Sequence, residues 1–199
     1  ALDVYFQKHI LGPLDMTDTS FMISPEKVDR FAANYGLADD GGLKLIDPAR
    51  DSSYASEKLF SGGGGLTSTA RDYHRFIEML RSKGEVDGVR LLGRKTVEYM
   101  TMNHLPGGGD LTSMGQAVFS ETSYDGIGFG LGFSIMLDPA KAQVIGSPGE
   151  HAWGGAASTA FWIDPVEDMS VIFLTQLMPS STYPLRRELK VLTYQALID

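Results

Sequence analysis

Three runs of β-favouring residues occupy the last third of the chain, at positions 131–137, 153–163 and 169–177. Asp164-Pro165-Val166-Glu167-Asp168 joins the second run to the third, and about five turn residues between two such runs predict an antiparallel hairpin. Pro184 then opens a final helical pattern. The expected apolar face of this helix carries Leu185, Leu189, Leu192 and Ala196. The chain is therefore predicted to end in an antiparallel sheet followed by a helix.

The part of the chain before these runs shows helical patterns separated by loops. Helices are predicted over residues 2–10, from Pro25, over 70–83 and over 95–102, with a long Gly- and Ser-rich loop over 106–130. The helix after residue 69 is the clearest, because Thr69 and Asp72 have the spacing of a capping box and an apolar stripe follows them. Asp39-Asp40-Gly41-Gly42 predicts a turn in an otherwise irregular stretch.

The charge, hydropathy and cysteine content of the chain exclude several kinds of partner and site. The chain has 17 Lys and Arg against 25 Asp and Glu, a formal net charge of −8, and no basic cluster. An acidic surface repels phosphate backbones, so we expect no nucleic-acid partner. No apolar run approaches the ~20 residues of a membrane-spanning helix, so we expect no membrane span. The absence of cysteine excludes disulfides and a Cys nucleophile, and it fits either the cytoplasm or the periplasm.

Neither the histidines nor the glycines form a cofactor motif. The four histidines do not pair at ligand spacing and no H-E-x-x-H occurs, so no metal site is predicted. The Gly-rich residues 61–65 lack the G-K-[ST] ending of a P-loop, and we interpret them as a turn that needs positive φ. The sequence therefore predicts no cofactor.

The segment His151-Ala152-Trp153-Gly154-Gly155-Ala156 is the sharpest local feature. Two glycines weaken the start of an apolar strand, and Gly is often found where another backbone or a ligand approaches closely. The indole of Trp153 could then form the wall of a pocket. Alternatively, Trp153 packs in the core and the two glycines form a bulge. The local sequence leaves both interpretations open.

A nucleophilic serine has one formal candidate. Ser24-Pro25-Glu26-Lys27 matches S-x-x-K, a pattern in which a Lys one helical turn from the Ser accepts the hydroxyl proton. The same residues also make an ordinary helix start, with Ser24 as N-cap and Pro25 as the first helical residue. We favour the helix start.

Several segments occur in the order found in a known family: residues 13–19 (PLDMTDT), 62–70 (GGGGLTSTA), 153–156 (WGGA) and 164–165 (DP). The chain resembles serine β-lactamase-like and penicillin-binding-protein-like proteins, and most of all class C β-lactamase-related enzymes and family VIII carboxylesterases. This resemblance implies an α+β fold, an antiparallel sheet flanked by helices. Residues 1–199 would be the C-terminal portion of one such domain, with 1–130 mainly helix and loop, and 131–199 the later strands and closing helix. The uncapped helical start at Ala1 agrees with a chain that is part of a longer protein.

The resemblance also implies a site. Trp153-Gly154-Gly155 stands at the family's K-T-G position, and Ala156 would offer its backbone N–H to the oxyanion hole. The missing side chains of Gly154 and Gly155 would let a substrate lie against the strand. His151 would either orient substrate or, as we favour, sit on the outer face of the strand. Because no Lys or Thr occupies the K-T-G position, an ester or amide is favoured over a β-lactam.

The family's S-x-x-K and tyrosine motifs precede every segment seen here, so the resemblance rejects Ser24 and Lys27 as the catalytic pair. It implies a serine hydrolase of small-molecule esters or amides whose nucleophile lies outside this chain, which alone would be inactive. The alternative is a catalytically inactive binding or scaffold domain. A sheet without its early strands would have an unpaired edge, where the missing N-terminal half or another chain could associate.

Overall fold

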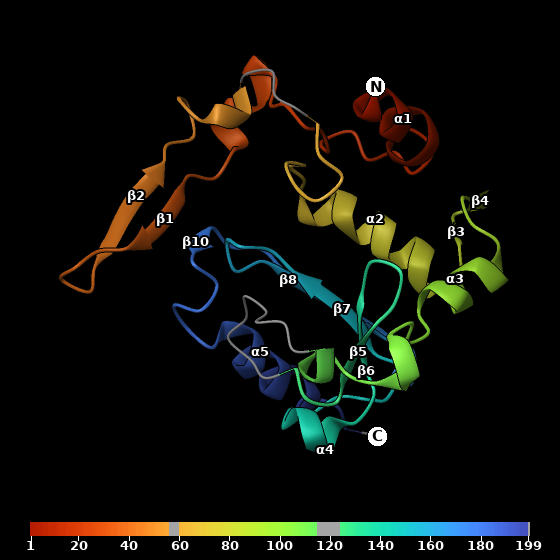
Figure 1. Cartoon of the computed structure of the whole chain (residues 1–199). Helices are drawn as coiled ribbons and strands as arrows, with labels where there is room; N and C mark the ends of the chain where they lie inside the picture. The colour runs from red at the N-terminus through yellow and green to blue at the C-terminus, as the bar shows by residue number, and fades with distance from the viewer. Residues whose placement is uncertain (56–59, 115–123, 199) are drawn as a thin grey trace. The chain divides into compact units, whose positions relative to one another are not determined.

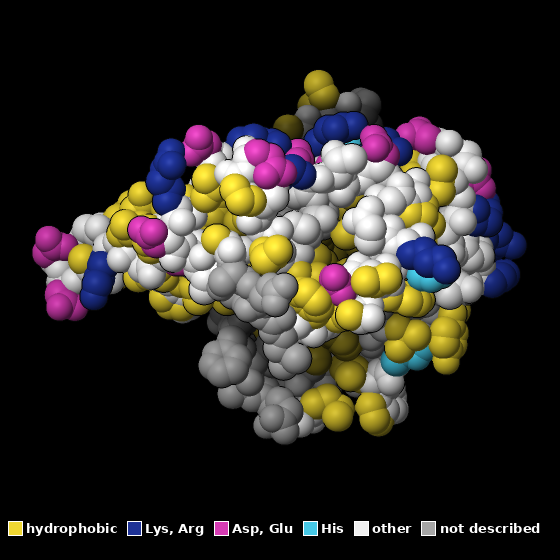
Figure 2. Space-filling model, turned by 90° about the horizontal axis from the view of Figure 1, so that it is seen from above, with side chains coloured by type: hydrophobic (Ala, Val, Ile, Leu, Met, Phe, Trp, Pro, Cys, Tyr) yellow, Lys and Arg dark blue, Asp and Glu magenta, His cyan; other side chains and the backbone are white. Residues whose placement is uncertain are grey.

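The computed structural model describes residues 1–55, 60–114 and 124–198. The chain forms two compact units, Ala1–Gly93 and Arg94–Asp199 (Figure 1). Every helix in the described part of the chain is too short or too polar to cross a bilayer. Acidic and basic side chains are interspersed with neutral and hydrophobic ones on the face drawn in Figure 2.

The first unit contains short helices, two hairpins and one longer helix. Its elements are α1 (Leu2–Phe6), η1 (Gln7–Leu11), η2 (Pro25–Arg30), β1 (Asn34–Leu37), β2 (Leu43–Asp47), η3 (Ser53–Ala55), α2 (Ala70–Arg81), β3 (Glu85–Val86) and β4 (Val89–Arg90). The helices predicted over residues 2–10 and from Pro25 are confirmed. The first continues from α1 into the π-helix η1, and the second is the 3-10 helix η2.

The hairpin of β1 and β2 surrounds the predicted turn at residues 39–42. The N–H of Ala38 donates to the carbonyl of Gly42 at 2.8 Å, which confirms the turn. The two strands are additional to what the sequence predicts, because with four and five residues they are too short for their alternation to stand out.

Helix α2 begins where the capping pattern places it. The hydroxyl of Thr69 accepts a hydrogen bond from the N–H of Asp72 at 3.2 Å. The apolar stripe predicted for this helix consists of Tyr73, Phe76, Ile77 and Leu80, and the last two of these residues are buried. Gly84 has a φ of 100°, and a Cβ there would lie 2.2 Å from the carbonyl oxygen of Leu92, so only glycine fits this helix end.

The second unit is built on a five-stranded antiparallel sheet. Its elements are α3 (Arg94–Met100), η4 (Pro106–Gly108), η5 (Thr112–Met114), β5 (Ile127–Phe129), β6 (Ser134–Met136), α4 (Pro139–Ala142), β7 (His151–Gly154), β8 (Ala160–Asp164), β9 (Met169–Phe173), β10 (Leu177–Met178) and α5 (Leu185–Tyr194). The strand order β5-β6-β7-β8-β9 follows the sequence, and α4 and α5 lie along the sheet (Figure 1). The predicted fold class, α+β with an antiparallel sheet flanked by helices, is confirmed.

The strand predictions need correction at three places. The run 169–177 is divided, because β9 ends at Phe173 and β10 is a separate strand, Leu177–Met178. The run 153–163 is not one strand but parts of β7 and β8, which fold back on each other so that Gly154 pairs with Ala160. Positive φ at Ser158 reverses the chain there, and the apolar composition of the run concealed this turn. The sheet also starts earlier than residue 131, because β5 lies inside the predicted loop 106–130; residues 115–123 of that loop lie outside the described part. The hairpin joining β8 to β9 is confirmed, with Asp164 opposite Met169.

The closing helix α5 is confirmed, but its apolar face is predicted wrongly. Leu192 is 58% exposed. Three polar residues instead contact the sheet side, Arg186 reaching Gly155, Lys190 reaching Glu150 and Tyr194 reaching Asp164. These residues are four positions apart, so they share one face of the helix. Polar partners at the two ends of β7 and at the end of β8 therefore face the same side of α5.

Candidate active site

The turn between β7 and β8 is a loop of three residues, 156–158, enclosed by Gly155 and Thr159. The N–H of Gly155 donates to the carbonyl of Thr159 at 2.9 Å, and the N–H of Ser158 donates to the carbonyl of Gly155 at 3.1 Å. Ser158 has a φ of 68°, the left-handed conformation usual for the last residue of such a loop. These two hydrogen bonds do not use the N–H of Ala156, and Ala156 is an exposed residue at the first loop position. The residue expected to donate in the oxyanion hole thus lies where a ligand can reach it.

Trp153 lies close to this turn and is partly exposed. Its side chain is 40% exposed, and its ring packs edge-on against Phe129 with 5.1 Å between centroids. Trp153 pairs with Phe161, and Gly154 with Ala160, in continuous register, so Gly154 does not form a bulge in the ladder. The arrangement agrees with an indole that borders a site better than with one enclosed in a core.

His151, at the start of β7, is buried. The ring is 5% exposed and packs edge-on against Phe133, with its Nδ1 3.2 Å from the carbonyl oxygen of Gly149. Burial lowers the pKa of His151 below its usual value. The interpretation that placed it on an outer strand face is therefore wrong, and its packing disfavours direct contact with a substrate.

The space left by the two glycines is occupied by neighbouring side chains. A Cβ on Gly154 would lie 2.5 Å from Cζ of Arg186, and one on Gly155 would lie 2.4 Å from the hydroxyl of Thr159. Arg186 donates from Nη2 to the carbonyl of Gly155 at 2.6 Å and to that of Thr159 at 3.0 Å. Gly154 therefore makes room for an arginine on the side of β7 that faces α5. The sequence gives one signal for this contact, the four-residue spacing of Arg186, Lys190 and Tyr194.

A buried polar cluster fixes α5 to the sheet. The hydroxyl of Tyr194 lies 2.8 Å from Oε2 of Glu150 and 2.6 Å from Oδ2 of Asp164, and Lys190 forms an ion pair with Glu150. Burial raises the pKa of Glu150, although Lys190 opposes the shift. Burial acts in the same direction on Asp164, but hydrogen bonds from Tyr194, Ser147 and two backbone N–H groups lower its pKa overall. The two carboxylates of the cluster therefore have pKa values displaced in opposite directions, that of Glu150 upward and that of Asp164 downward.

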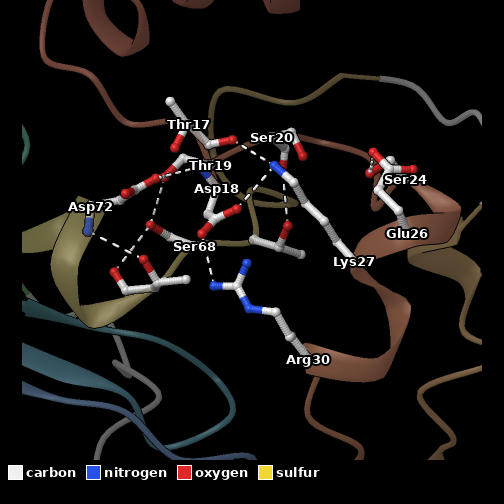
Figure 3. Close-up of polar contacts among 12 residues, drawn as sticks. Thr17, Asp18, Thr19, Ser20, Ser24, Glu26, Lys27, Arg30, Ser68 and Asp72 are labelled. Carbon is white, nitrogen blue, oxygen red and sulfur yellow. Dashed lines mark hydrogen bonds and ion pairs between the residues drawn. The ribbon is translucent and has the colours of Figure 1, made fainter.

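Ser24 and Lys27, in the first unit, are not arranged as a nucleophile and its base (Figure 3). The hydroxyl of Ser24 donates to the carboxylate of Glu26 at 2.5 Å. The ammonium of Lys27 donates to the carbonyl of Thr17 at 2.6 Å and pairs with Asp18 at 3.0 Å. Because both side chains have these other partners, the geometry agrees with their rejection as the catalytic pair.

Two of the segments that carry the family resemblance meet in this part of the chain (Figure 3). The buried carboxylate of Asp72 accepts hydrogen bonds from the N–H of Asp18 at 2.7 Å and from the hydroxyl of Thr19 at 2.9 Å. The hydroxyls of Thr19 and Ser68 lie 2.7 Å apart. Hydrogen bonds from Arg30 and Lys27 hold the pKa of Asp18 well below its usual value. These contacts join residues 17–19 to the start of α2 and give this pair of motifs a structural role.

Comparison with known proteins places the chain among larger relatives. Two curated proteins of Mycobacterium tuberculosis, "Protein Rv1367c" and "Uncharacterized protein MT1414", are each 36% identical over 175 residues, which is 86% of this chain and 42% of theirs. A LovD6 mutant of simvastatin synthase from Aspergillus terreus matches with a TM-score of 0.78 at 26% identity, covering 98% of this chain and 50% of that one. The fold of EstCE1, a hydrolase with promiscuous acyltransferase activity, matches with a TM-score of 0.71 at 24% identity, over 96% and 50% of the two chains.

The chain thus spans half or less of the length of these relatives. The family model described as Beta-lactamase matches residues 1–195, almost the entire sequence. The order of the sequence segments, the antiparallel sheet and this match agree with one another, and the chain belongs to the beta-lactamase family.

Proposed function

We propose that the protein containing this chain is a serine hydrolase that cleaves small-molecule esters or amides through an acyl-serine intermediate. The observation that carries the proposal is the position of Ala156, an exposed residue at the start of the β7–β8 loop whose N–H is not used by the two hydrogen bonds that close the loop. A fixed backbone N–H of this kind stabilises the negative oxygen that develops when a serine attacks a carbonyl. One such donor typically contributes roughly 3–4 kcal/mol to transition-state stabilisation.

The substrate class follows from the residues around this N–H. Trp153 offers a partly exposed indole next to the turn, which suits an apolar acyl or alcohol group. A β-lactam carboxylate would require a cation or hydroxyl at the K-T-G position, where Trp153, Gly154 and Gly155 stand. The nearby cation, Arg186, is engaged with the carbonyls of Gly155 and Thr159. An uncharged ester or amide is therefore the favoured substrate.

We assign the nucleophile and its base to a part of the protein outside residues 1–199. Lys27 is engaged by Asp18 and Thr17, and Ser24 by Glu26, so that pair is not arranged as a nucleophile and its base. By this proposal, residues 1–199 are the C-terminal portion of one domain. The strand β9 pairs with β8 and is an edge of the five-stranded sheet. That edge is where the remaining strands, or another chain, would add.

The second candidate is a binding or scaffold domain without catalysis, favoured by the engagement of Ser24 and Lys27 in other contacts. A fluorophosphonate probe applied to the complete protein separates the two candidates. The hydrolase must be labelled on one serine that precedes Ala1 and is followed three residues later by lysine. If the folded protein is not labelled, the binding or scaffold domain is the remaining candidate. By this proposal, residues 1–199 alone should give no burst of nitrophenol from p-nitrophenyl esters, because the serine that performs the covalent step lies outside them.

A further inference from the structure

We infer that Arg186 is a positioning residue for the oxyanion hole, acting on Ala156 through the peptide group that links it to Gly155. The inference rests on the proposed function, since it concerns the same N–H. The K-T-G-like segment itself does not contain this residue, which reaches the site from the first turn of α5.

The geometry of one peptide group carries the argument. The carbonyl of Gly155 and the N–H of Ala156 belong to the same planar peptide, so they point in opposite directions when the bond is trans. Arg186 donates to that carbonyl at 2.6 Å from the side of α5. A charged donor bound to the oxygen fixes the plane of the peptide and therefore the direction of the N–H. Because Arg186 approaches from the side of α5, the N–H of Ala156 points to the opposite side of the turn, which stays free for substrate.

The same hydrogen bond also strengthens the donor. Hydrogen bonds to charged groups are roughly twice as strong as neutral ones, and a peptide polarised at its oxygen has a more positive N–H. The carbonyl of Gly155 accepts a second bond from the N–H of Ser158 at 3.1 Å, which adds to the polarisation. The N–H of Ala156 is thus prepared for an anionic oxygen before substrate arrives, which is what oxyanion stabilisation requires.

Several contacts fix the guanidinium in this place. Its Nη2 also donates to the carbonyl of Thr159 at 3.0 Å, so it bridges both sides of the loop. The three atoms nearest to a Cβ built on Gly154 all belong to the guanidinium, which shows how closely it lies against the strand. One and two turns further along α5, Lys190 and Tyr194 hold the helix to the sheet. Gly154 is therefore required for the approach of Arg186. The buried cluster of Glu150, Asp164, Lys190 and Tyr194 sets the distance between α5 and the β7–β8 loop.

The test uses the complete protein and variants at three positions. Arg186→Gln removes the charge, Arg186→Lys keeps it, and Gly154→Ala displaces the guanidinium with a single carbon at a residue whose φ is ordinary. Arg187→Gln is the matched control, because this neighbouring exposed arginine donates to the carbonyl of Gln143 instead. The measurements are kcat and KM with a p-nitrophenyl ester, and the infrared carbonyl stretch of the acyl-enzyme.

We expect Arg186→Gln and Gly154→Ala to lower kcat about tenfold with KM changed less than about twofold, a fraction of the roughly 10²–10³-fold cost of losing a whole donor. The ester carbonyl stretch should move to higher wavenumber in both, because a weaker oxyanion donor polarises it less. Arg186→Lys should restore part of the activity, and Arg187→Gln should match the wild type.

The possible outcomes separate the proposed function from the role of Arg186. If the wild-type protein forms no acyl-enzyme, the proposed function fails, and the role of Arg186 fails with it. If the wild type acylates but the carbonyl stretch and kcat of the folded Arg186→Gln variant equal those of the wild type, only the role of Arg186 is overturned. Should Arg186→Gln fail to fold, Gly154→Ala tests the same role, since an unchanged stretch in that variant contradicts it.

Discussion

The hydroxyl of Tyr194, in the last turn of α5, donates a hydrogen bond of 2.6 Å to the carboxylate of Asp164 at the end of β8. Asp164 is fully buried. A buried carboxylate that loses a hydrogen-bond donor still pays the cost of its desolvation. Removing this contact therefore costs more stability than the net free energy of one hydrogen bond. The pair joins the closing helix to the sheet, and through α5 it sets where Arg186 meets the β7–β8 loop.

Tyr194→Phe should therefore destabilise the fold. The loss leaves Glu150 and Asp164 without the hydroxyl between them, and we expect the unfolding free energy to fall by about 1–3 kcal/mol. Urea unfolding of the complete protein measures this. Tyr183→Phe is the control, because Tyr183 is exposed just before α5 and its hydroxyl should be replaceable without cost. Equal stability of the two variants would contradict the anchoring role of Tyr194.

The buried ring of His151 predicts a pH dependence. Its pKa in the folded protein lies below the usual 6.5 because burial disfavours the charged imidazole. The unfolded chain therefore binds more protons as pH falls below 6.5, so the stability contributed by neutral His151 is present above that pH and lost as pH falls through the lower folded pKa. His151→Gln should lose less stability than the wild type in this window, as measured by urea unfolding at a series of pH values. His74→Gln, which removes an exposed imidazole from α2, is the control for the loss of a histidine that is not buried.

The carboxylate of Asp72 predicts a defect in the first unit. Asp72→Ala removes the acceptor for the N–H of Asp18 and the hydroxyl of Thr19, and should cost about 1–3 kcal/mol. Faster hydrogen exchange at the amide of Asp18 would locate the loss. The control is Asp29→Ala, whose carboxylate is exposed and pairs with Arg50, and which should change stability by less than about 0.5–1 kcal/mol. A protected Asp18 amide in Asp72→Ala would refute the assignment.

Short-range patterns in the sequence predict the local elements of this fold well. The capping pair Thr69 and Asp72 and the closing Gly84 mark α2 because each acts on backbone groups a few residues away. Short-range patterns also predict the turn that begins at Asp164 and the start of α5 after Pro184. The family resemblance, which combines several such segments in order, points to Ala156 and the neighbouring glycines.

Contacts between segments far apart in the chain are not predicted by such short-range patterns. Leucine spacing favours Leu192 as a core residue of α5, yet the helix turns Arg186 and Lys190 toward the sheet, because their partners Gly155 and Glu150 lie 31 and 40 residues away. Asp72 shows the same effect. Its spacing suggests a bond back to the helix start, whereas its side chain binds residues 18 and 19. A polar side chain that hydrogen-bonds to residues far away in the sequence leaves no periodic pattern from which its position can be predicted.

Ser158 offers a test of the loop that presents Ala156. Its φ of 68° is unfavourable for a residue with a Cβ, while its hydroxyl donates to the carbonyl of Leu177 at 2.7 Å. Ser158→Ala loses the hydrogen bond and keeps the strain, and should cost about 1–2 kcal/mol. Ser158→Gly loses both, so it should be about 1 kcal/mol more stable than Ser158→Ala. Comparison of the two variants by urea unfolding isolates the strain, and the reverse order of stability would contradict the loop conformation.

Ala156→Pro removes the one hydrogen bond donor on which the proposed function depends. Proline has no N–H, and its fixed φ suits the first position inside a turn, where Ala156 stands between Gly155 and the residues that close the loop. The variant should fold, bind substrate and lose about 10²–10³-fold in kcat in the complete protein. Ala156→Ser keeps the N–H and is the matched control, expected within about twofold of wild type. A fully active Ala156→Pro enzyme would show that the oxyanion is stabilised elsewhere, even if a serine is still acylated, and would move the candidate site away from the β7–β8 loop.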